Sequence, residues 1–379
     1  MFLSNILRFL ICKVSRILPV KRNKILFVSH LGKNYSCNPK YICEYLLKLG
    51  DTKFELVYLY DPTNCNPDIF PKAVRPLNIY SRRFLYDIAT CGFIVSNTRI
   101  PEWFGFYPRR KQIYLQTWHS SLRLKKIEKD ANLGPDYEVW AKSDSKKISV
   151  IISGCTFSSQ IFRNSFWYSG KILEIGTPRI DYLLNLKEED VLGFMKKASL
   201  DSDFHYLLYA PTFRSGGDTT AYNIDYKLLI KSLEEKFGGK WRILFRLHPN
   251  LKDVVDIDSL PSCCIDMSGY DDIQELIAIS DIMITDYSSC MFDMAFIGKL
   301  CILYASDLEQ YIKNERNLYF DIASLPFPLA KNNGDLNELI KLFNANNYKS
   351  KLSKFINEIG SFEKGTACAE ILNFIVKNK

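Results

Sequence analysis

The sequence lacks the signatures of several common ligand sites. Its 379 residues include only four histidines and neither a C-x-x-C pair nor a His-x-x-x-His spacing, which excludes the usual zinc motifs. Neither G-x-x-x-x-G-K-S/T nor G-x-G-x-x-G occurs, so there is no P-loop and no dinucleotide fingerprint. Two Asp-x-Asp pairs, Asp201 with Asp203 and Asp256 with Asp258, lie in predicted loops, and we interpret both as solvated turns. The sequence therefore predicts no metal site and no cofactor.

Two further absences bear on location and partners. The eleven cysteines are scattered and fit no disulfide framework, which predicts reduced thiols in a cytoplasmic protein. No block of Lys and Arg is interleaved with aromatic residues, so we expect no nucleic-acid partner. The net charge of +8 favours another anionic partner, such as a nucleotide, a phosphate group or an acidic membrane face.

The N-terminus has no apolar run long enough to cross a membrane, because Arg8, Lys13 and Arg16 interrupt it. It also lacks a small-residue cleavage site, which argues against a signal peptide. On a helix over residues 1–22, the apolar side chains share one side and the cations lie mainly across from it. This pattern predicts an amphipathic helix lying on a membrane. The alternative is a helix that docks on the protein's own core or on a partner subunit.

What the sequence does contain is a regular alternation of strand and helix patterns, which is typical of α/β folds with parallel sheets. The alternation restarts near residue 204, so we predict two Rossmann-like domains, 23–190 and 191–379. The last helical pattern, 351–379, is expected to cross back to the first domain. The strands are predicted at 24–31, 54–60, 93–101, 112–118, 150–154, 171–176, 206–212, 241–249, 281–289 and 300–305, and the helices before the last at 41–50, 82–90, 158–167, 226–239, 273–280, 291–298 and 336–343.

Polar side chains gather where several of these strands end, which is where α/β sheets place ligands. His119 begins a basic stretch, with Arg123, Lys125 and Lys126, that we expect to be a helix. The other residues at strand ends are Arg179, Arg246, His248, Ser288 and Ser289.

Each of these positions has a plain structural explanation. A histidine beside Trp118 can be a hydrogen-bonded core residue, Arg179 can lie in a surface turn, and Ser288 or Ser289 can cap a helix. A functional hypothesis explains the set together. The serines and arginines would bind a diphosphate, and His119 would take a proton from an incoming hydroxyl.

The residues of these motifs and their order along the chain resemble those of one family. The segments are GKNYSCNPKYICEYL, VSNTR, QTWHSSLRLKKI, EIGTPRIDYL, LLYAPTFR, RLHPN and SDIMITDYSSCMFDMAF, and together with a later YASDLEQY and YFD they cover roughly residues 24–325. They are similar to the CDP-glycerol glycerophosphotransferase family of teichoic-acid and capsule enzymes. The resemblance implies a GT-B type fold, with two Rossmann-like domains facing across a cleft, and a peripheral protein at the cytoplasmic side of the membrane. It also implies transfer of glycerol phosphate, or a related polyol phosphate, from a CDP-alcohol to a lipid-linked saccharide or polyol-phosphate acceptor, with release of CMP.

The resemblance also assigns roles to individual residues. In the first domain, expected to bind the acceptor, His119 matches the histidine of the family's Trp-His-Gly-Thr motif and is the expected base. The second domain is expected to bind the CDP-donor. The candidate catalytic residues are His119 and His248, and the candidate donor-binding residues are Trp118, Ser120, Ser121, Arg179, Thr212, Phe213, Arg246, Ser288, Ser289 and Asp293.

The chain departs from the family pattern at two places. Ser120-Ser121-Leu122 stands where the family has Gly-Thr-Pro, and Phe213 replaces a tryptophan. These changes leave the transferred polyol open. Two alternatives also remain: a glycosyltransferase of the same fold, with Asp293 as its sugar-binding carboxylate, and a non-catalytic nucleotide- or membrane-binding scaffold.

Overall fold

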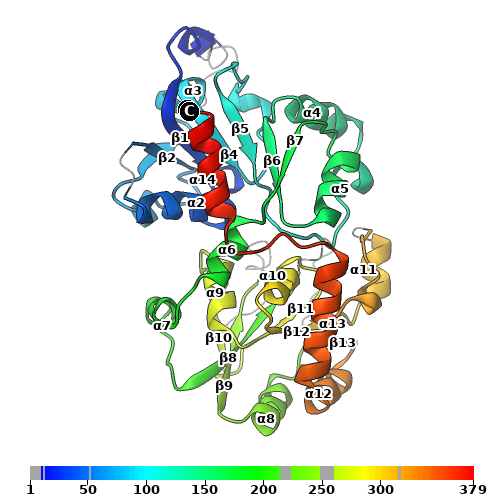
Figure 1. The fold of residues 1–379 in the computed structure, drawn as a ribbon. Helices are drawn as coiled ribbons and strands as arrows, with labels where there is room; N and C mark the ends of the chain where they lie inside the picture. The colour runs from blue at the N-terminus through cyan, green and yellow to red at the C-terminus, as the bar shows by residue number, and fades with distance from the viewer. Residues whose placement is uncertain are drawn as a thin grey trace. The chain divides into compact units, whose positions relative to one another are not determined.

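The computed structural model describes residues 10–11, 13–50, 53–212, 214, 223–247, 260–314 and 317–379. The chain forms two compact α/β units (Figure 1). Unit 1 comprises Met1–Ser121, Ile127–Tyr182 and Phe362–Lys379. Unit 2 comprises Leu122–Lys126 and Leu183–Ser361.

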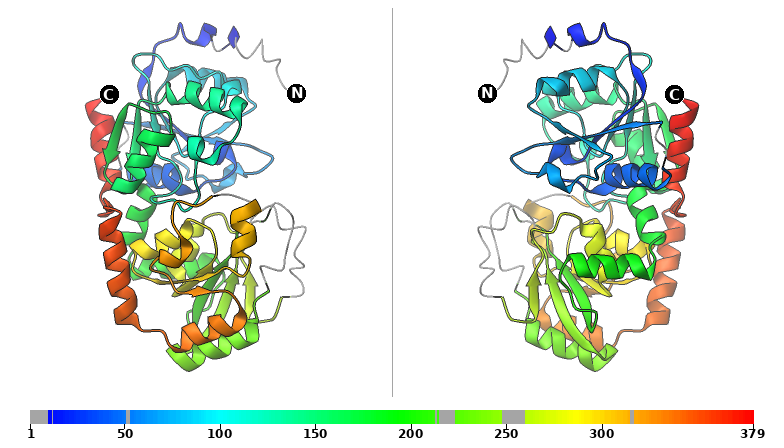
Figure 2. Two further views of the ribbon diagram at one scale, coloured as in Figure 1. Left: turned by 90° about the vertical axis from the view of Figure 1, so that its right-hand side faces the viewer. Right: turned by 90° about the vertical axis from the view of Figure 1, so that its left-hand side faces the viewer.

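Unit 1 is built on a seven-stranded parallel sheet with the order β3-β2-β1-β4-β5-β6-β7. Side chains alternate across a strand, so β1 sends Leu26 and Val28 into one core cluster and Ile25 and Phe27 into the other. Helices α3 and α5 cover the first face, and α2 and α14 cover the second (Figure 2). The strands are β1 Lys21–Val28, β2 Glu55–Tyr60, β3 Arg75–Asn78, β4 Cys91–Ser96, β5 Ile113–Gln116, β6 Val150–Ser153 and β7 Lys171–Glu174; the helices are α2 Cys37–Lys48, α3 Arg82–Thr90, α4 Pro135–Ser145, α5 Thr156–Ser165, α6 Pro178–Leu184 and α14 Ala367–Lys377.

Unit 2 has a six-stranded parallel sheet with the order β10-β9-β8-β11-β12-β13. Its strands β11 and β12 are buried along their whole length, because both faces of the sheet are covered. The strands are β8 Phe204–Ala210, β9 Lys240–Phe245, β10 Cys264–Asp266, β11 Ile282–Thr285, β12 Leu300–Tyr304 and β13 Leu329–Ala330; the helices are α7 Glu188–Lys197, α8 Tyr226–Phe237, α9 Ile273–Ile279, α10 Cys290–Phe296, α11 Leu308–Asn314, α12 Asn333–Lys341 and α13 Ala345–Glu358.

The C-terminal segment returns to the first unit, but the prediction of one helix over 351–379 was wrong. Helix α13 ends at Glu358 and α14 begins at Ala367. Gly360 and Gly365, with φ angles of 65° and 76°, end and separate the two helices, since this region of φ favours glycine. Helix α14 then packs against α2 through Ile371 and Ile375, which are fully buried in unit 1 (Figure 1).

The predicted basic helix after His119 was also wrong. The stretch that contains Arg123, Lys125 and Lys126 is extended, and Leu124 N–H and C=O bond to Ser289 and Tyr319 of unit 2. Leu122 and Leu124 are fully buried, and Lys125 forms an isolated antiparallel bridge with Leu318, which a helical residue would not do. Arg123 is 2% exposed, so it does not lie on a solvated helix face.

Residues 1–9 and 12 of the predicted N-terminal helix lie outside the described residues. Residues 10, 11 and 13–15 are helical, but β1 already begins at Lys21, so the helix ends before the predicted residue 22. Within the described ranges, no helix combines the length and apolar character needed to span a bilayer. None of the ten cysteines that the structure describes forms a disulfide.

Candidate active site

His119 follows β5 of unit 1, at the carboxyl edge of the sheet. Trp118, with φ of 51°, turns the chain sharply, and its ring stacks on the His119 imidazole at 4.6 Å. The imidazole Nδ1 lies 3.0 Å from the Asn97 carbonyl oxygen. Because a carbonyl can only accept, Nδ1 carries the proton, and in the neutral imidazole Nε2 then keeps its lone pair. His119 is therefore held in the tautomer that a general base requires.

Asn97, which follows the neighbouring strand β4, contacts two histidines at once. Its carbonyl accepts from His119, and its side-chain Oδ1 accepts the His30 amide at 2.8 Å. The rings of His30 and His119 lie 6.0 Å apart. The VSNTR segment therefore contributes a positioning residue to this edge of unit 1.

Arg179 lies in the first turn of α6, not in an open surface turn. Its guanidinium donates to the His119 carbonyl and to Cys37 Sγ. Asn38 links the same two segments: its Oδ1 accepts the Arg179 amide at 2.9 Å, and its Nδ2 donates to the Trp118 carbonyl at 2.9 Å. Unit 1 thus brings His119 and Arg179 together, with Asn38 between their loops.

Ser120 and Ser121 complete this loop, and both are buried. The Ser121 carbonyl accepts from the Ser158 hydroxyl at 2.7 Å. Its own hydroxyl lies beside the Glu363 carboxylate, which comes from the returning C-terminal segment. The Ser121 side chain therefore faces the interior of unit 1.

In unit 2, Thr212 follows β8 and is bound to the residues that follow β11. The Thr212 amide donates to Asp286 at 2.9 Å, and Arg214 donates to Asp286 at 2.8 Å and Asp307 at 2.6 Å. The guanidinium lies 4.9 Å from the ring centroids of Tyr287 and Tyr311. Its two carboxylates raise the pKa of Arg214, although burial opposes this. This network ties the LLYAPTFR and TDYSS motifs together.

Ser288 and Ser289 are half-buried at the start of α10. Ser288 Oγ lies 3.5 Å from the Cys290 amide, and Ser289 Oγ accepts from Leu124 N–H at 3.3 Å. Ser289 makes no side-chain cap hydrogen bond. Asp293, one turn later, is 1% exposed and accepts from Gln274 Nε2 at 3.3 Å. The serines thus lie at the carboxyl edge of the sheet, whereas the Asp293 side chain lies in the core of unit 2.

Arg246 follows β9 and is partly engaged within its own unit. Its guanidinium donates to the carbonyls of Met267 and Tyr270. Burial lowers the pKa of Arg246, because desolvation disfavours its charged form. These two bonds fix the guanidinium at the end of the loop that follows β10.

Two of the predicted site residues, Phe213 and His248, lie outside the described residues, as does the pair Asp256 and Asp258. Asp203 N–H donates to Asp201 Oδ1 at 2.9 Å, which confirms a turn there. The described parts of the chain contain no group of three or more His, Cys, Asp or Glu side chains able to hold a metal ion.

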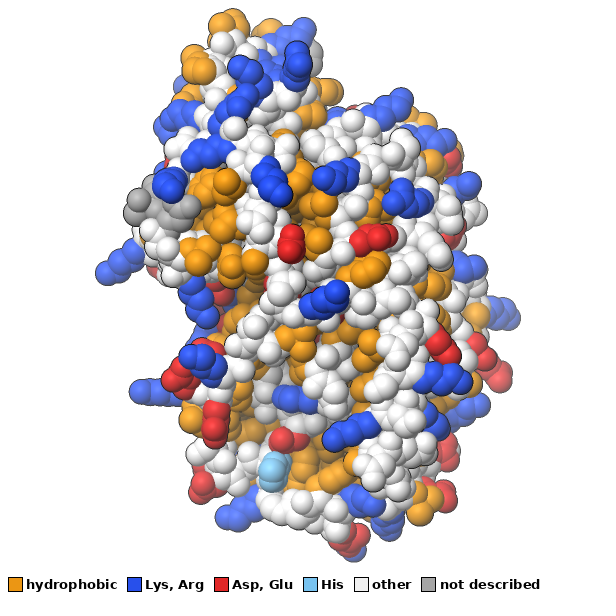
Figure 3. All heavy atoms as spheres, in the orientation of Figure 1, with side chains coloured by type: hydrophobic (Ala, Val, Ile, Leu, Met, Phe, Trp, Pro, Cys, Tyr) orange, Lys and Arg blue, Asp and Glu red, His pale blue; other side chains and the backbone are white. Residues whose placement is uncertain are grey.

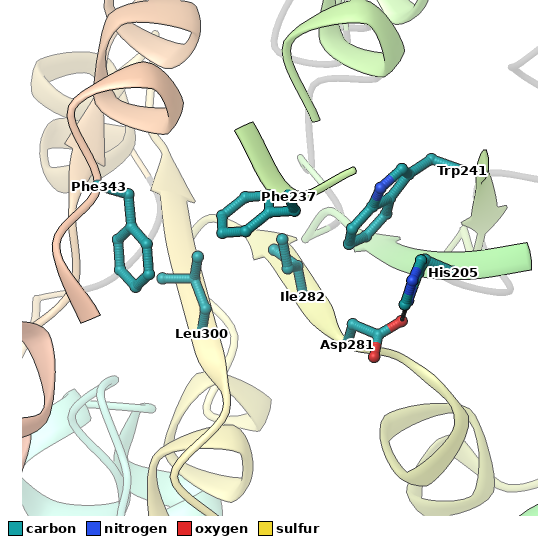
Figure 4. Close-up of a pocket in the computed structure, with 7 residues that line it drawn as sticks. All are labelled: His205, Phe237, Trp241, Asp281, Ile282, Leu300 and Phe343. Atoms are coloured by element: carbon teal, nitrogen blue, oxygen red, sulfur yellow. Dashed lines mark hydrogen bonds and ion pairs between the residues drawn. The ribbon is translucent and has the colours of Figure 1, made fainter. Parts of the chain in front are cut away.

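A pocket of about 240 Å³ in unit 2 lies away from these residues (Figure 4). It opens at the amino ends of β8, β9, β11 and β12, whereas the candidate residues follow the carboxyl ends of the strands. His205 and Asp281 form a 3.1 Å contact at one side of it. The lining residues are His205, Phe237, Trp241, Asp281, Ile282, Leu300 and Phe343.

Sequence reasoning missed four positioning residues: Asn38, Asn97, Arg214 and Glu363. The first three lie inside the quoted motifs, and Arg214 directly follows Phe213. Glu363 lies far along the chain in an unremarked stretch, and only the return of the C-terminal segment brings it to unit 1. No local sequence pattern points to Glu363 as a residue near the site.

Comparisons with known proteins find several teichoic acid enzymes as relatives. The chain is 30% identical over 378 residues to a teichoic acid poly(glycerol phosphate) polymerase of Bacillus spizizenii, covering 96% of this chain and 94% of that protein. It is 32% identical to a teichoic acid glycerol-phosphate transferase of Staphylococcus aureus, covering 94% and 93%. Two further polymerases of this kind are longer, and the chain spans about half of each.

A solved structure of the wall teichoic acid polymerase TagF has the same fold. It matches with a TM-score of 0.85 and 28% identity, covering 99% of this chain and 95% of that one. The model of the CDP-glycerol:poly(glycerophosphate) glycerophosphotransferase family matches residues 10–377. The chain therefore belongs to this family of transferases.

Proposed function

We propose that this enzyme transfers glycerol phosphate from CDP-glycerol to a hydroxyl of a lipid-linked teichoic-acid acceptor and releases CMP. The observation that carries the proposal is the His119 imidazole, whose Nδ1 is bound to the Asn97 carbonyl and whose Nε2 is able to take a proton. The family match and the teichoic-acid relatives support the choice of donor and pathway.

The reaction needs one proton acceptor and a site for the diphosphate. His119 Nε2 takes the proton of the acceptor hydroxyl, whose oxygen attacks the phosphorus that bears glycerol. The bond from that phosphorus to the bridging oxygen breaks, and CMP leaves with the developing charge. We assign Arg179, Arg246, Ser288 and Ser289 to the diphosphate, because charge-assisted and hydroxyl hydrogen bonds stabilise such charge.

The two units have separate roles in this proposal. Unit 1, which carries His119, would bind the acceptor, and unit 2, which carries Thr212 and the serines after β11, would bind the CDP-donor. Together they would form a GT-B type enzyme, in which one Rossmann-like domain binds each substrate. The remaining predicted residues, Trp118, Ser120, Phe213, His248 and Asp293, are assigned to the same site by family resemblance alone.

A donor panel tests the function. We expect CDP-glycerol to raise the melting temperature of the protein and to be converted to CMP when an acceptor is present. CDP-ribitol and a UDP-sugar are the comparison donors, and mass spectrometry of the product identifies the unit added. Stabilisation and turnover with the UDP-sugar alone would replace this proposal with a glycosyltransferase. The burial of Asp293, the carboxylate which that alternative needs, does not favour it.

We also propose that the N-terminal segment contacts the cytoplasmic face of the membrane. Arg109 donates to the carbonyls of Arg16 and Leu18, both at 2.7 Å, which holds the segment on unit 1. Val14 and Ile17 nevertheless expose 64% and 84% of their surface. Apolar side chains and cations occur together on the upper part of the surface in Figure 3. This combination suits a surface with anionic headgroups.

Replacing Val14 and Ile17 by serine should weaken sedimentation with anionic phospholipid vesicles by about tenfold or more, because two apolar side chains no longer enter the interface. The fold should stay intact, since both side chains are exposed. The matched control replaces Val139 and Leu342, which are 71% and 72% exposed elsewhere, by serine. Equal sedimentation of the two double variants and the wild type would contradict membrane contact through this segment.

A further inference from the structure

Glu363 is the first charged side chain after the C-terminal segment re-enters unit 1. The preceding residue is anchored there, because Phe362 N–H donates to the Gly154 carbonyl at 2.8 Å. The carboxylate is bound to the loop after β7: Oε2 accepts the Thr177 amide at 2.9 Å, and Oε1 accepts the Thr177 hydroxyl at 2.8 Å. On its other side lies the hydroxyl of Ser121. One carboxylate therefore contacts two loops that are far apart in the sequence.

The backbone around this carboxylate leaves room for it. A Cβ at Gly154 would lie 2.5 Å from Glu363 Oε1, and a Cβ at Gly176 would lie 2.7 Å from Oε2. Both distances are below normal van der Waals contact, and Gly176 also has a φ of 89°. Side chains at either glycine would displace the carboxylate. The ends of β6 and β7 thus form a cradle that fits this group.

The two loops that Glu363 joins are those that carry the candidate chemistry. Ser121 comes two residues after His119, and Thr177 comes two residues before Arg179. The Arg179 guanidinium also donates to the His119 carbonyl. A shift of either loop would therefore move the base relative to the arginine, and small misplacements of reacting groups lower rates strongly.

We propose that Glu363 is a positioning residue for the transfer reaction. It holds the loop of His119 and the start of α6, where Arg179 lies, in fixed positions through Ser121 and Thr177. The inference rests on the proposed function, since it assigns Glu363 to the same site. Glu363 touches neither donor nor acceptor in this role; it acts through the two loops.

The protonation state of Glu363 gives this role a measurable signature. Glu363 is half-buried, and its desolvation raises its pKa to about 8. The charge of Asp181 on α6 adds to the rise, while the nearby Ser121 hydroxyl and the hydrogen bonds from Thr177 oppose it. The Cys368 thiol, at the start of α14, also lies within reach: burial raises its pKa, and the charges of Asp181 and Glu363 add to that rise. Below the pKa of Glu363 its side chain is a neutral acid. Glutamine has the same shape, with its oxygen for the Thr177 amide and its NH₂ group for the hydroxyls.

The experiment compares Glu363→Ala and Glu363→Gln with the wild type in the CMP-release assay. We expect Glu363→Ala to lower kcat by about 10- to 100-fold with little change in the KM for CDP-glycerol, because geometry and not donor binding is lost. Glu363→Gln should keep near-normal turnover at pH 7. It should lack the fall in kcat that we expect of the wild type as pH rises through about 8. There, ionisation of Glu363 places a negative charge in a desolvated position near Asp181. Glu370→Gln, an exposed position on α14, is the matched control.

Hydrogen–deuterium exchange tests the same contacts without turnover. Glu363→Ala should speed exchange of the Thr177 amide and of the peptide over residues 116–123, whereas Glu370→Gln should not. Wild-type kcat in Glu363→Ala, unchanged exchange, or a pH step near 8 that persists in folded Glu363→Gln would each overturn the proposal. If the wild type releases no CMP from CDP-glycerol, the proposed function fails, while the exchange result still decides whether Glu363 holds the two loops.

Discussion

His119→Ala is expected to lower turnover by about 10²- to 10⁴-fold, which is the usual contribution of a positioned general base. The loss should fall on kcat. The proton that His119 Nε2 takes belongs to the acceptor, so the affinity for the CDP-donor, measured by calorimetry, should change little. The melting temperature should change little as well, because the imidazole is only partly buried.

A second substitution separates a base from a structural histidine. The amide of His119→Gln can still donate to the Asn97 carbonyl, but it cannot take a proton at neutral pH. If the histidine only supports the loop, glutamine should restore turnover. If it is the base, glutamine should be as inactive as alanine. His205→Ala, which removes an exposed histidine paired with Asp281, is the matched control and should remain active. Near-normal turnover in folded His119→Ala would end the catalytic assignment.

Arg99→Ala is expected to destabilise the protein by about 3–5 kcal/mol, the cost of removing one partner from a buried ionic cluster. The Arg99 guanidinium is 3% exposed and pairs with Glu128 at 2.8 Å and with Asp144 at 3.0 Å. It also donates to the carbonyls of Ala141 and Phe166. Without it, two buried carboxylates have lost their cation. Urea unfolding of the full chain measures the change in the free energy of unfolding.

The loss should depend on pH, which distinguishes it from a simple cavity. Burial raises the pKa of Asp144 from 3.8 to about 6, and Arg99 opposes that rise. In the wild type, the folded state therefore holds a proton that the unfolded state has lost, and this contribution to stability declines as pH rises from about 4 through 6. In Arg99→Ala the pKa of Asp144 should rise further, because the cation that favours its ionised form is missing. The destabilisation should therefore be smaller at pH 5 than at pH 8.

Two controls accompany this measurement. Arg99→Lys keeps a charge but not the planar fork that reaches several acceptors, so it should recover only part of the loss. Arg83→Ala removes a cation that is 56% exposed and pairs at i,i+4 with the buried Asp87. Because Asp87 keeps Lys24 and Arg75 as partners, the change should cost less than about 1 kcal/mol. An Arg99→Ala protein as stable as Arg83→Ala would contradict the assigned role of the cluster.

Periodic segments were predictable from the sequence because their pattern records burial. The helix over 82–90 has the predicted bounds, and β6 and β7 lie within the predicted runs. Short or polar elements were missed: α4 has little amphipathic pattern, and β3 is only four residues long. The helix α6 was interpreted as a turn, since Pro178 at its start resembles a loop signal as much as a first helical residue.

These differences have one physical cause. The residue pattern of a short segment does not show which other parts of the chain pack against it. The basic stretch that contains Arg123 was predicted to be a helix, but in unit 2 Arg123 is buried between Leu122 and Leu124. Asp293 is predicted as a donor contact from its motif; in the structure it is 1% exposed beside Gln274, and its contact with the donor stays a prediction. In both cases the spacing of the residues is compatible with either environment, and tertiary packing decides between them.

The sequence by itself determined the α/β class, the restart of the alternation that marks a second sheet, and the strand ends at which His119, Arg179, Thr212 and Ser288 occur. Those features depend on hydrophobic periodicity and local motifs, which are written in neighbouring residues. Only the tertiary structure decided the tautomer of His119, through the Asn97 carbonyl, and the arrival of Glu363 between Ser121 and Thr177. These contacts join residues 22 to 242 positions apart, and a hydrogen bond between distant residues leaves no periodic trace in the chain.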